Sequence, residues 1–280
     1  MIHTAKQMKD LIRNFSNKTG VEAHVLIRRF MMERLLERIS LSRYNRSFIL
    51  KGGMLVSALV GIDLRGTMDI DTTVNGLPVT IEDMEQILRE VVAIPVEDCV
   101  TFQIKSIANI MEDAEYGGIR IALEAHLDHS VTPLKLDVST GDVITPGEIR
   151  YAYPLMFENR TISLMAYPLE TVLAEKVETI LSRATLNTRM RDFYDVFILV
   201  ENCWDSIRSD FLRAAIKATT NKRGSAELLG SVGKSLSAIL DSNELQALWL
   251  NYQKKNEYSA QCDWHMAMSA LQKICDLAEL

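Results

Sequence analysis

The 280-residue sequence predicts an α+β protein, with a mixed sheet and flanking helices followed by a helical second half. Apolar residues recur at three- and four-residue steps in residues 1–45 and again after Pro168, which is typical of helices. Between these regions, short segments rich in β-branched residues alternate apolar and polar side chains, as strands do. Because helices and strands are segregated along the chain, we expect an α+β domain at 1–165 and a helical domain at 166–280.

The N-terminal part predicts helices and then a first strand. The sequence VEAHVLIRRFMMERLLERI at 21–39 has helical periodicity, and Asn17 and Thr19 are candidate caps ahead of it. FILKGG at 48–53 predicts a strand that runs into a tight turn. MLVSALV at 54–60 can then start a helix.

The next elements are a second strand and a capped helix. DIDTTV at 69–74 reads as a strand that ends at Asn75 and Gly76, a typical turn pair. Thr80 is expected to cap a helix at 81–92, because its hydroxyl can accept a bond from a free amide of the first turn.

More strands complete the mixed region. Gly117 and Gly118 indicate a hairpin between the first two of these strands. A short apolar segment at 162–167 precedes Pro168, after which the pattern is helical to the end. The three longer strand-like segments are 100–110, 119–127 and 133–139.

Composition indicates a globular protein with reduced thiols. Apolar residues make up 48% of the chain, and no apolar run reaches the roughly 18 residues that span a bilayer. The four cysteines form no CxxC pair, which favours free thiols over disulfides or a zinc site. We therefore expect a cytoplasmic protein with no membrane partner.

Positive charge is concentrated near the N-terminus. Residues 1–51 hold 11 Lys and Arg against 4 Asp and Glu, a net charge of +7, so the remainder carries −13 within an overall −6. The cluster can be a solvated helix face or a surface that binds the phosphates of RNA. Its arginines are Arg28, Arg29, Arg34, Arg38, Arg43 and Arg46.

Two carboxylates one residue apart suggest a metal site. On a strand, Asp69 and Asp71 would project from the same face while Ile70 is buried. Such a pair repels itself unless a proton or a cation neutralises it, and Mg²⁺ prefers carboxylate and phosphate oxygens. A lone pair of this kind is also common in loops and edge strands, so this pattern alone does not decide.

Glycines and a third aspartate strengthen the hypothesis. Gly52 and Gly53 lie between a strand and a helix start, where backbone amides can approach a phosphate. Asp137 ends a strand-like run and could complete a metal site or take a proton, although aspartate also favours turns.

Four motifs in order resemble a known family. KGGMLVSALVGIDLRGTMDID at 51–71 resembles the motif of the AbiEii/AbiGii nucleotidyltransferase-like toxins, which belong to the DNA polymerase β-type nucleotidyltransferase superfamily. KLDV at 135–138, PLETVLAEK at 168–176 and RDFYDV at 191–196 follow in the same order. The chain departs from the wider superfamily at Gly53, where serine is frequent, and in a longer gap to the aspartate pair.

The resemblance implies a fold, a reaction and partners. It implies a nucleotidyltransferase-type sheet and transfer of a nucleoside monophosphate from an NTP to RNA, with a tRNA 3′ end as one acceptor. It also implies Mg²⁺ or Mn²⁺ as cofactor, growth arrest or abortive infection, and a separately encoded antitoxin that need not touch the toxin. The region Arg28–Arg46 then becomes a candidate RNA surface.

The resemblance also assigns site residues. Asp69, Asp71 and Asp137 would be catalytic and hold the metal, and Lys176 and Asp192 would be further catalytic residues from the helical domain, which would complete the active-site cleft. Two other functions stay open: an NTP-binding (GTP-binding) toxin without transfer, and nucleotidyl transfer to a protein hydroxyl. The residues assigned to nucleotide binding are Lys51, Gly52, Gly53, Arg65, Thr67 and Lys176.

Overall fold

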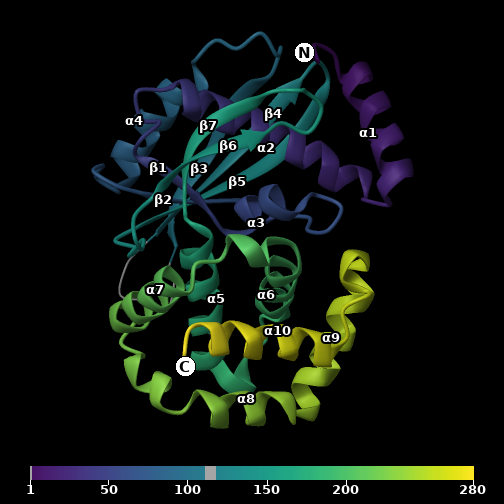
Figure 1. Cartoon of the computed structure of the whole chain (residues 1–280). Helices are drawn as coiled ribbons and strands as arrows, with labels where there is room; N and C mark the ends of the chain where they lie inside the picture. The colour runs from purple at the N-terminus through teal and green to yellow at the C-terminus, as the bar shows by residue number, and fades with distance from the viewer. Residues whose placement is uncertain (1, 111–117) are drawn as a thin grey trace. The chain divides into compact units, whose positions relative to one another are not determined.

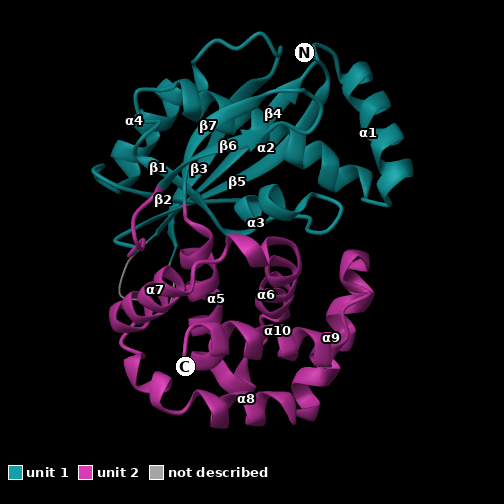
Figure 2. Cartoon of the chain, in the orientation of Figure 1, with its two compact units in different colours: residues 1–142, 149–166 teal, residues 143–148, 167–280 magenta. Residues whose placement is uncertain are grey.

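The computed structural model describes residues 2–110 and 118–280 and divides into two compact units (Figure 2). Unit 1 comprises Met1–Asp142 and Ile149–Ala166, and unit 2 comprises Val143–Glu148 and Tyr167–Leu280. Unit 1 contains the sheet, whereas unit 2 is helical (Figure 1). The predicted α+β class, a mixed sheet with flanking helices and a helical second half, is therefore confirmed.

The sheet of unit 1 has seven strands among the described residues, in the order β3-β4-β5-β2-β1-β7-β6. It is mixed, because β1 runs antiparallel to β2 and parallel to β7, and β2 runs parallel to β5. The sequence did not predict β6, and the turn between β3 and β4 lies outside the described residues. The strands are β1 (Phe48–Lys51), β2 (Ile70–Val74), β3 (Thr101–Ile110), β4 (Gly118–Leu127), β5 (Ser130–Thr140), β6 (Ile149–Pro154) and β7 (Thr161–Ala166).

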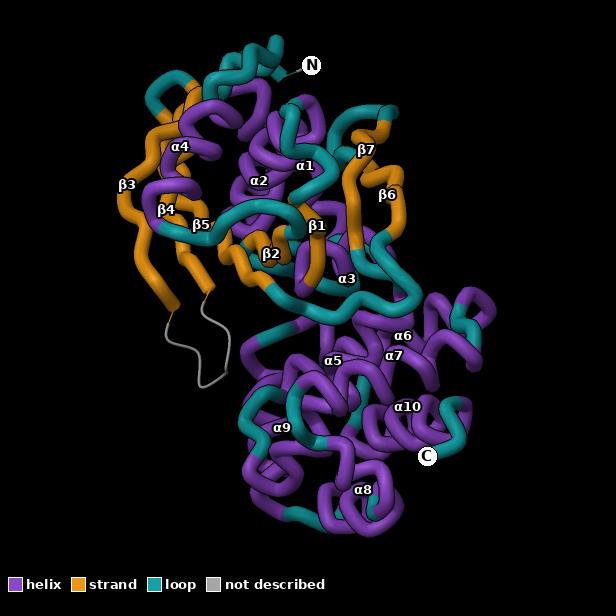
Figure 3. The backbone as a smooth tube through the Cα atoms, turned by 90° about the vertical axis from the view of Figure 1, so that its left-hand side faces the viewer, coloured by secondary structure: helices purple, strands orange, loops and turns teal. Residues whose placement is uncertain are grey.

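Helix α2 forms the centre of unit 1. It packs against β5 and β7, and Figure 3 shows the strands curving around it. Helix α1 lies against α2, and α4 packs on both α2 and β3. Met31, Met32 and Leu35 of α2 have no exposed surface, so this helix supplies much of the core. The helices are α1 (Ala5–Thr19), α2 (Ala23–Leu41), α3 (Gly52–Val60) and α4 (Ile81–Val92).

The cap predicted for α4 is correct, whereas the two caps predicted ahead of α2 are wrong. Thr80 caps α4, since its hydroxyl accepts the amide of Asp83 at 3.1 Å. Asn17 and Thr19, however, lie inside α1, which continues to the left-handed residue Gly20. The Thr19 hydroxyl donates back to the Phe15 carbonyl instead, at 2.8 Å. The prediction failed because helix propensity through the first 19 residues outweighs two weak capping signals.

Unit 2 is built on α5 and α6, which pack on α7 and α10. Trp249 is 1% exposed and its indole N–H donates to the Cys262 carbonyl at 3.0 Å, which makes it a core residue of this unit. Among the described residues, no helix is long and apolar enough to cross a membrane. The helices are α5 (Leu169–Arg183), α6 (Met190–Cys203), α7 (Ser209–Lys222), α8 (Val232–Leu240), α9 (Asn243–Lys255) and α10 (Trp264–Leu277).

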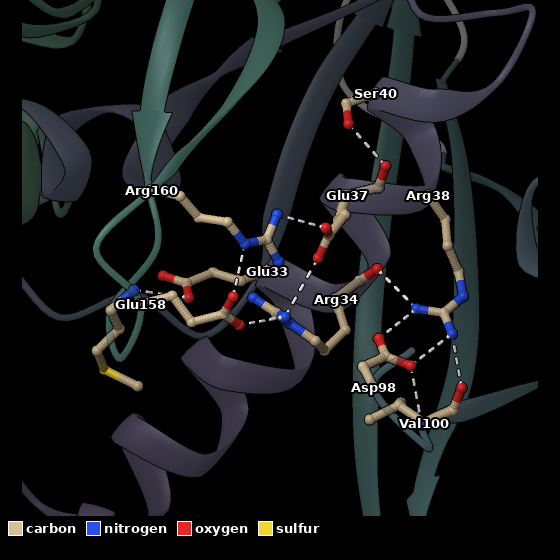
Figure 4. Close-up of polar contacts among 10 residues, drawn as sticks. Glu33, Arg34, Glu37, Arg38, Ser40, Asp98, Val100, Glu158 and Arg160 are labelled. Carbon is tan, nitrogen blue, oxygen red and sulfur yellow. Dashed lines mark hydrogen bonds and ion pairs between the residues drawn. The ribbon is translucent and has the colours of Figure 1, made fainter. Parts of the chain in front are cut away.

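A buried arginine network ties α2 to distant parts of unit 1 (Figure 4). Arg38 makes two bonds to Asp98, of 2.7 and 2.9 Å, and a third to the Val100 carbonyl. Arg34 donates to Glu158 at 2.7 Å. The network comprises Glu33, Arg34, Glu37, Arg38, Asp98, Glu158 and Arg160.

This network corrects part of the charge interpretation. Arg29, Arg34 and Arg38 are 4%, 1% and 3% exposed, and each is paired with a carboxylate. The expectation that they belong to an RNA-facing surface is therefore wrong. The alternative of a solvated helix face is wrong for them too, because all three side chains are buried in unit 1.

The Arg38–Asp98 pair generates a stability prediction. We expect Arg38→Met to lower the free energy of unfolding by about 3–5 kcal/mol, because Asp98 has no exposed surface and would keep an unpaired charge. Arg43→Met is the matched control, since Arg43 pairs with Glu90 on the surface and its loss should cost about 1 kcal/mol or less. Urea unfolding measures both, and equal losses would contradict the prediction.

Candidate active site

Four charged residues form a row across the sheet of unit 1. Lys51 on β1 lies opposite Asp71 on β2, Asp71 lies opposite Asp137 on β5, and Asp137 lies opposite Arg120 on β4. Register partners on neighbouring strands project from the same face. The row therefore presents two carboxylates flanked by two cations, and we call it the charged row.

Alternation places this row away from the core. Ile70, Leu136 and Ile121 precede or follow the row on their strands, and none has any exposed surface. Because successive side chains of a strand point to opposite faces, the charged row lies on the face opposite to these buried residues. The buried position of Ile70, expected from the sequence, is confirmed.

Gly52 brings the turn after β1 into contact with Asp71. Its φ of +64° is in the left-handed region, and a Cβ built there would lie 2.1 Å from Asp71 Oδ2. Any side chain at this position would therefore displace the carboxylate. The next residue, Gly53, lies in the first turn of α3 and donates its backbone N–H to the Asp71 carboxylate. This amide, which the sequence suggested for a phosphate, is engaged with Asp71 instead.

The surroundings of Asp71 favour its protonated form. Burial raises the pKa of the Asp71 carboxyl above its ordinary value, and the nearby Asp137 and Asp69 raise it further. Lys51 and the Gly53 N–H lower the pKa but do not cancel the increase. A buried carboxylate among other carboxylates is stabilised by a nearby cation.

Asp137 and Lys51 are held by partners at the two ends of the row. Arg120 donates to both oxygens of Asp137, at 2.8 and 2.6 Å, in a bidentate pair. The Lys51 ammonium lies 2.6 Å from Asp142, which also accepts the Ser139 hydroxyl. The sequence interpretation missed both Arg120 and Asp142.

The remaining predicted residues of unit 1 surround Gly53. A Cβ on Gly53 would lie 2.7 Å from Thr67 Oγ1 and 3.1 Å from an Arg65 nitrogen, so its small size admits both side chains. Arg65 is 1% and Thr67 5% exposed, and Arg65 donates to the Gly66 carbonyl. The buried side chains of Arg65 and Thr67 therefore support the turn from its buried side. Asp69 lies one residue before β2, on the bend that leads into it.

Unit 2 contains a second charged cluster. Lys176 on α5 donates to Asp195 at 2.6 Å and to Asp192 at 3.1 Å, both on α6. Arg189 donates to the other oxygen of Asp192 at 2.8 Å. Lys176 is 11% exposed in its side chain, so this lysine is largely enclosed by carboxylates rather than extended into solvent. Asp192 and Asp195 are three residues apart on α6 and so share one helix face, which lets both reach the same ammonium.

The fit of a divalent cation depends on these carboxylates. Within the part of the chain that the structure describes, no group of three or more His, Cys, Asp or Glu is arranged as a ligand set. Asp137 is engaged by Arg120, which leaves Asp69 and Asp71 as neighbouring donors. Mg²⁺ is commonly bound by one or two carboxylates together with substrate phosphates, and this pair fits such a site.

Comparison with known proteins agrees with the fold and identifies a family. The sequence profile described as "Nucleotidyl transferase AbiEii toxin, Type IV TA system" matches residues 34–267. A crystal structure of a "putative nucleotidyltransferase from H. pylori" (Helicobacter pylori) has a TM-score of 0.51 at 17% identity, over 92% of this chain and 98% of that chain. The crystal structure of JHP933 from Helicobacter pylori has a TM-score of 0.49 at 17% identity, covering 92% and 95%. No curated protein matches the chain.

The contact between Gly52 and Asp71 generates a prediction with a matched control. Gly52 and Gly76 both have positive φ, but nothing lies within 4 Å of a Cβ on Gly76. We expect Gly76→Ala to cost about 1–2 kcal/mol of left-handed strain, and Gly52→Ala to cost clearly more because it also displaces Asp71. Urea unfolding of both variants tests this. Equal losses in the free energy of unfolding would show that the close contact between Gly52 and Asp71 does not contribute to stability.

The raised pKa of Asp71 predicts a pH-dependent effect. A raised folded-state pKa means that the native protein holds its proton more tightly, so stability falls as pH rises from about 3.9, the unfolded value, through the folded value. Asp71→Asn removes this loss. In metal-free buffer with EDTA, its melting temperature should exceed that of the wild type at pH 7, and the difference should shrink towards pH 4. A difference independent of pH would contradict the assignment.

Proposed function

The chain belongs to the family of AbiEii nucleotidyl transferase toxins of type IV toxin–antitoxin systems, and from this we propose that it transfers a nucleoside monophosphate from an NTP to RNA. The observation that supports this most directly is the charged row, with Asp71 held against the turn that begins α3. We propose a tRNA 3′ end as the acceptor, and growth arrest or abortive infection as the consequence. The family implies a cognate antitoxin.

The proposed reaction is an in-line displacement at phosphorus. The acceptor hydroxyl oxygen bonds to the α-phosphorus, the bond from that phosphorus to the oxygen bridging the α- and β-phosphates breaks, and pyrophosphate leaves. We propose that Asp69 and Asp71 hold Mg²⁺ or Mn²⁺, which would neutralise phosphate charge. The proton of the attacking hydroxyl passes to Asp137, whose oxygens keep free lone pairs beside their bonds to Arg120.

Other residues of the proposal position these groups or compensate charge. Gly52 and Gly53 set the distance between the turn and Asp71, while Arg65 and Thr67 support Gly53 from the buried side. Lys51 compensates charge at one end of the row.

We assign the cluster of unit 2 to the triphosphate. The resemblance of its motifs supports a role for Lys176 in neutralising phosphate charge. Asp192 holds the Lys176 ammonium, and Asp195 lies on the same ammonium at 2.6 Å. Both carboxylates are at least 94% buried, so they fix the lysine side chain in one position.

A transfer assay tests the proposal. The protein is incubated with each labelled NTP in turn, total RNA and Mg²⁺, and the label is followed. We expect label on RNA. Asp71→Asn should lower the rate at least about 100-fold, because it removes a ligand of the proposed metal ion that would neutralise charge at the reacting phosphate. Asp210→Asn, an exposed aspartate of unit 2, is the control and should keep its rate.

The position of the label decides among the alternatives. Label on protein would indicate transfer to a protein hydroxyl, and NTP binding without any transfer would indicate a binding toxin. Either result overturns the RNA proposal. Full transfer by Asp71→Asn would overturn the site assignment instead. In growing cells, induced expression should arrest growth with the wild type and not with Asp71→Asn.

A further inference from the structure

Unit 1 contains a small polar cavity that shares no residue with the charged row. Its volume is about 130 Å³. The last turn of α2, the connection to β1, and strands β6 and β7 form its walls. The lining residues are Ser40, Asn45, Arg46, Arg150, Ser163, Leu164 and Met165.

The two arginines of this cavity differ from most arginines of the chain. Arg46 and Arg150 are both exposed, and the guanidinium group of neither has a hydrogen bond or an ion pair to any described residue. No acidic residue lines the cavity. By contrast, Arg34, Arg38 and Arg120 each bind a carboxylate directly. Two guanidinium groups thus meet at one cavity without a carboxylate partner, and they form a positively charged site for an anion.

The end of helix α2 does not account for these charges. Cations are favoured near a helix C-terminus, where the last carbonyls need donors. Two of those carbonyls have donors from the chain already, because the Ser42 hydroxyl and backbone N–H donate to the Ile39 carbonyl and the Asn45 side-chain amide donates to the Ser40 carbonyl. The hydroxyl of Ser40 is likewise bound to the Glu37 carbonyl, as Figure 4 shows. Arg46 and Arg150 remain available to an external anion.

The size of the cavity selects the anion. About 130 Å³ is roughly ten times the volume that one water needs, so a phosphate group fits. It is well below the roughly 300 Å³ at which ligand pockets begin, so a whole nucleotide does not. Arginine forms bidentate bonds to phosphate oxygens, and the Ser163 hydroxyl offers a further donor.

We propose that Arg46 and Arg150 bind one backbone phosphate of the RNA acceptor. This inference rests on the proposed RNA acceptor and adds a contact site to it. A polynucleotide can place a single backbone phosphate in this cavity while its bases and sugars remain outside. A free nucleotide would gain only this one phosphate contact, because its base and sugar do not fit. Of the arginines in the basic N-terminal region, the proposed site uses Arg46, which is joined at the cavity by Arg150 from a distant part of the sequence.

The test compares two double variants of equal charge. Fluorescently labelled single-stranded RNA is titrated with the full chain at several salt concentrations, without NTP, so that catalysis is not needed. Arg46→Gln/Arg150→Gln should weaken RNA binding about tenfold at low salt and reduce the slope of log Kd against log salt by about 0.7. Lys6→Gln/Lys9→Gln removes two exposed charges of α1 outside the cavity and should stay within about twofold of wild type.

The outcomes separate this inference from the function. Equal weakening by both double variants would overturn the site in favour of diffuse electrostatics, and no weakening by the arginine variant would overturn it outright. If inorganic phosphate binds the wild type and not the arginine variant while RNA affinity is unchanged, the site takes free phosphate and the RNA assignment is wrong. RNA binding lost in the arginine variant supports the inference even if the transfer assay finds no nucleotidyl transfer. Unchanged melting temperatures verify that all variants are folded.

Discussion

The contact between the Asp71 carboxylate and the backbone of Gly52 is the constraint on which the charged row depends. It requires a glycine at positive φ directly after β1, and it directs the Gly53 amide onto the carboxylate. The β1–β2 and β2–β5 ladders then fix the neighbours, because register places Lys51 on one side of Asp71 and Asp137 on the other. The β4–β5 ladder adds Arg120 beside Asp137, so one tight turn and three ladders position the whole row.

The row is electrically compensated by the protein itself. Each of its carboxylates has a cationic neighbour on an adjacent strand, Lys51 beside Asp71 and Arg120 beside Asp137. Burial, and then repulsion by Asp137 and Asp69, nevertheless raise the pKa of the Asp71 carboxyl. A metal cation that binds Asp69 and Asp71 would therefore offset this repulsion, and this would couple binding to stability. The same carboxylate that destabilises the free protein is the one expected to hold the metal.

Local patterns predicted the elements well and their partners poorly. Alternation and glycines placed β1, β2, β4 and β5, and the Thr80 cap was correct, because these features depend on a few adjacent residues. The contact of Arg120 with Asp137 depends on register, which is a property of two strands. It could have been found from the two-residue turn at Asp128 and His129, since pairing Leu127 with Ser130 fixes every later pair of that hairpin. Strand β6 lacked such a signal, because it is only six residues long, four of them are exposed, and it ends at Pro154.

Charge density along the sequence was misleading for a related reason. A net charge of +7 in residues 1–51 says how many cations are present, but not which carboxylates fold against them. Three of the clustered arginines are neutralised by acids as distant in sequence as Asp98 and Glu158, because α2 lies at the centre of unit 1. A cationic side chain therefore indicates a site for an external anion only if no carboxylate of the protein pairs with it. At the cavity, Arg46 and Arg150 both meet this condition, and Arg150 lies on β6, a strand that the sequence did not predict.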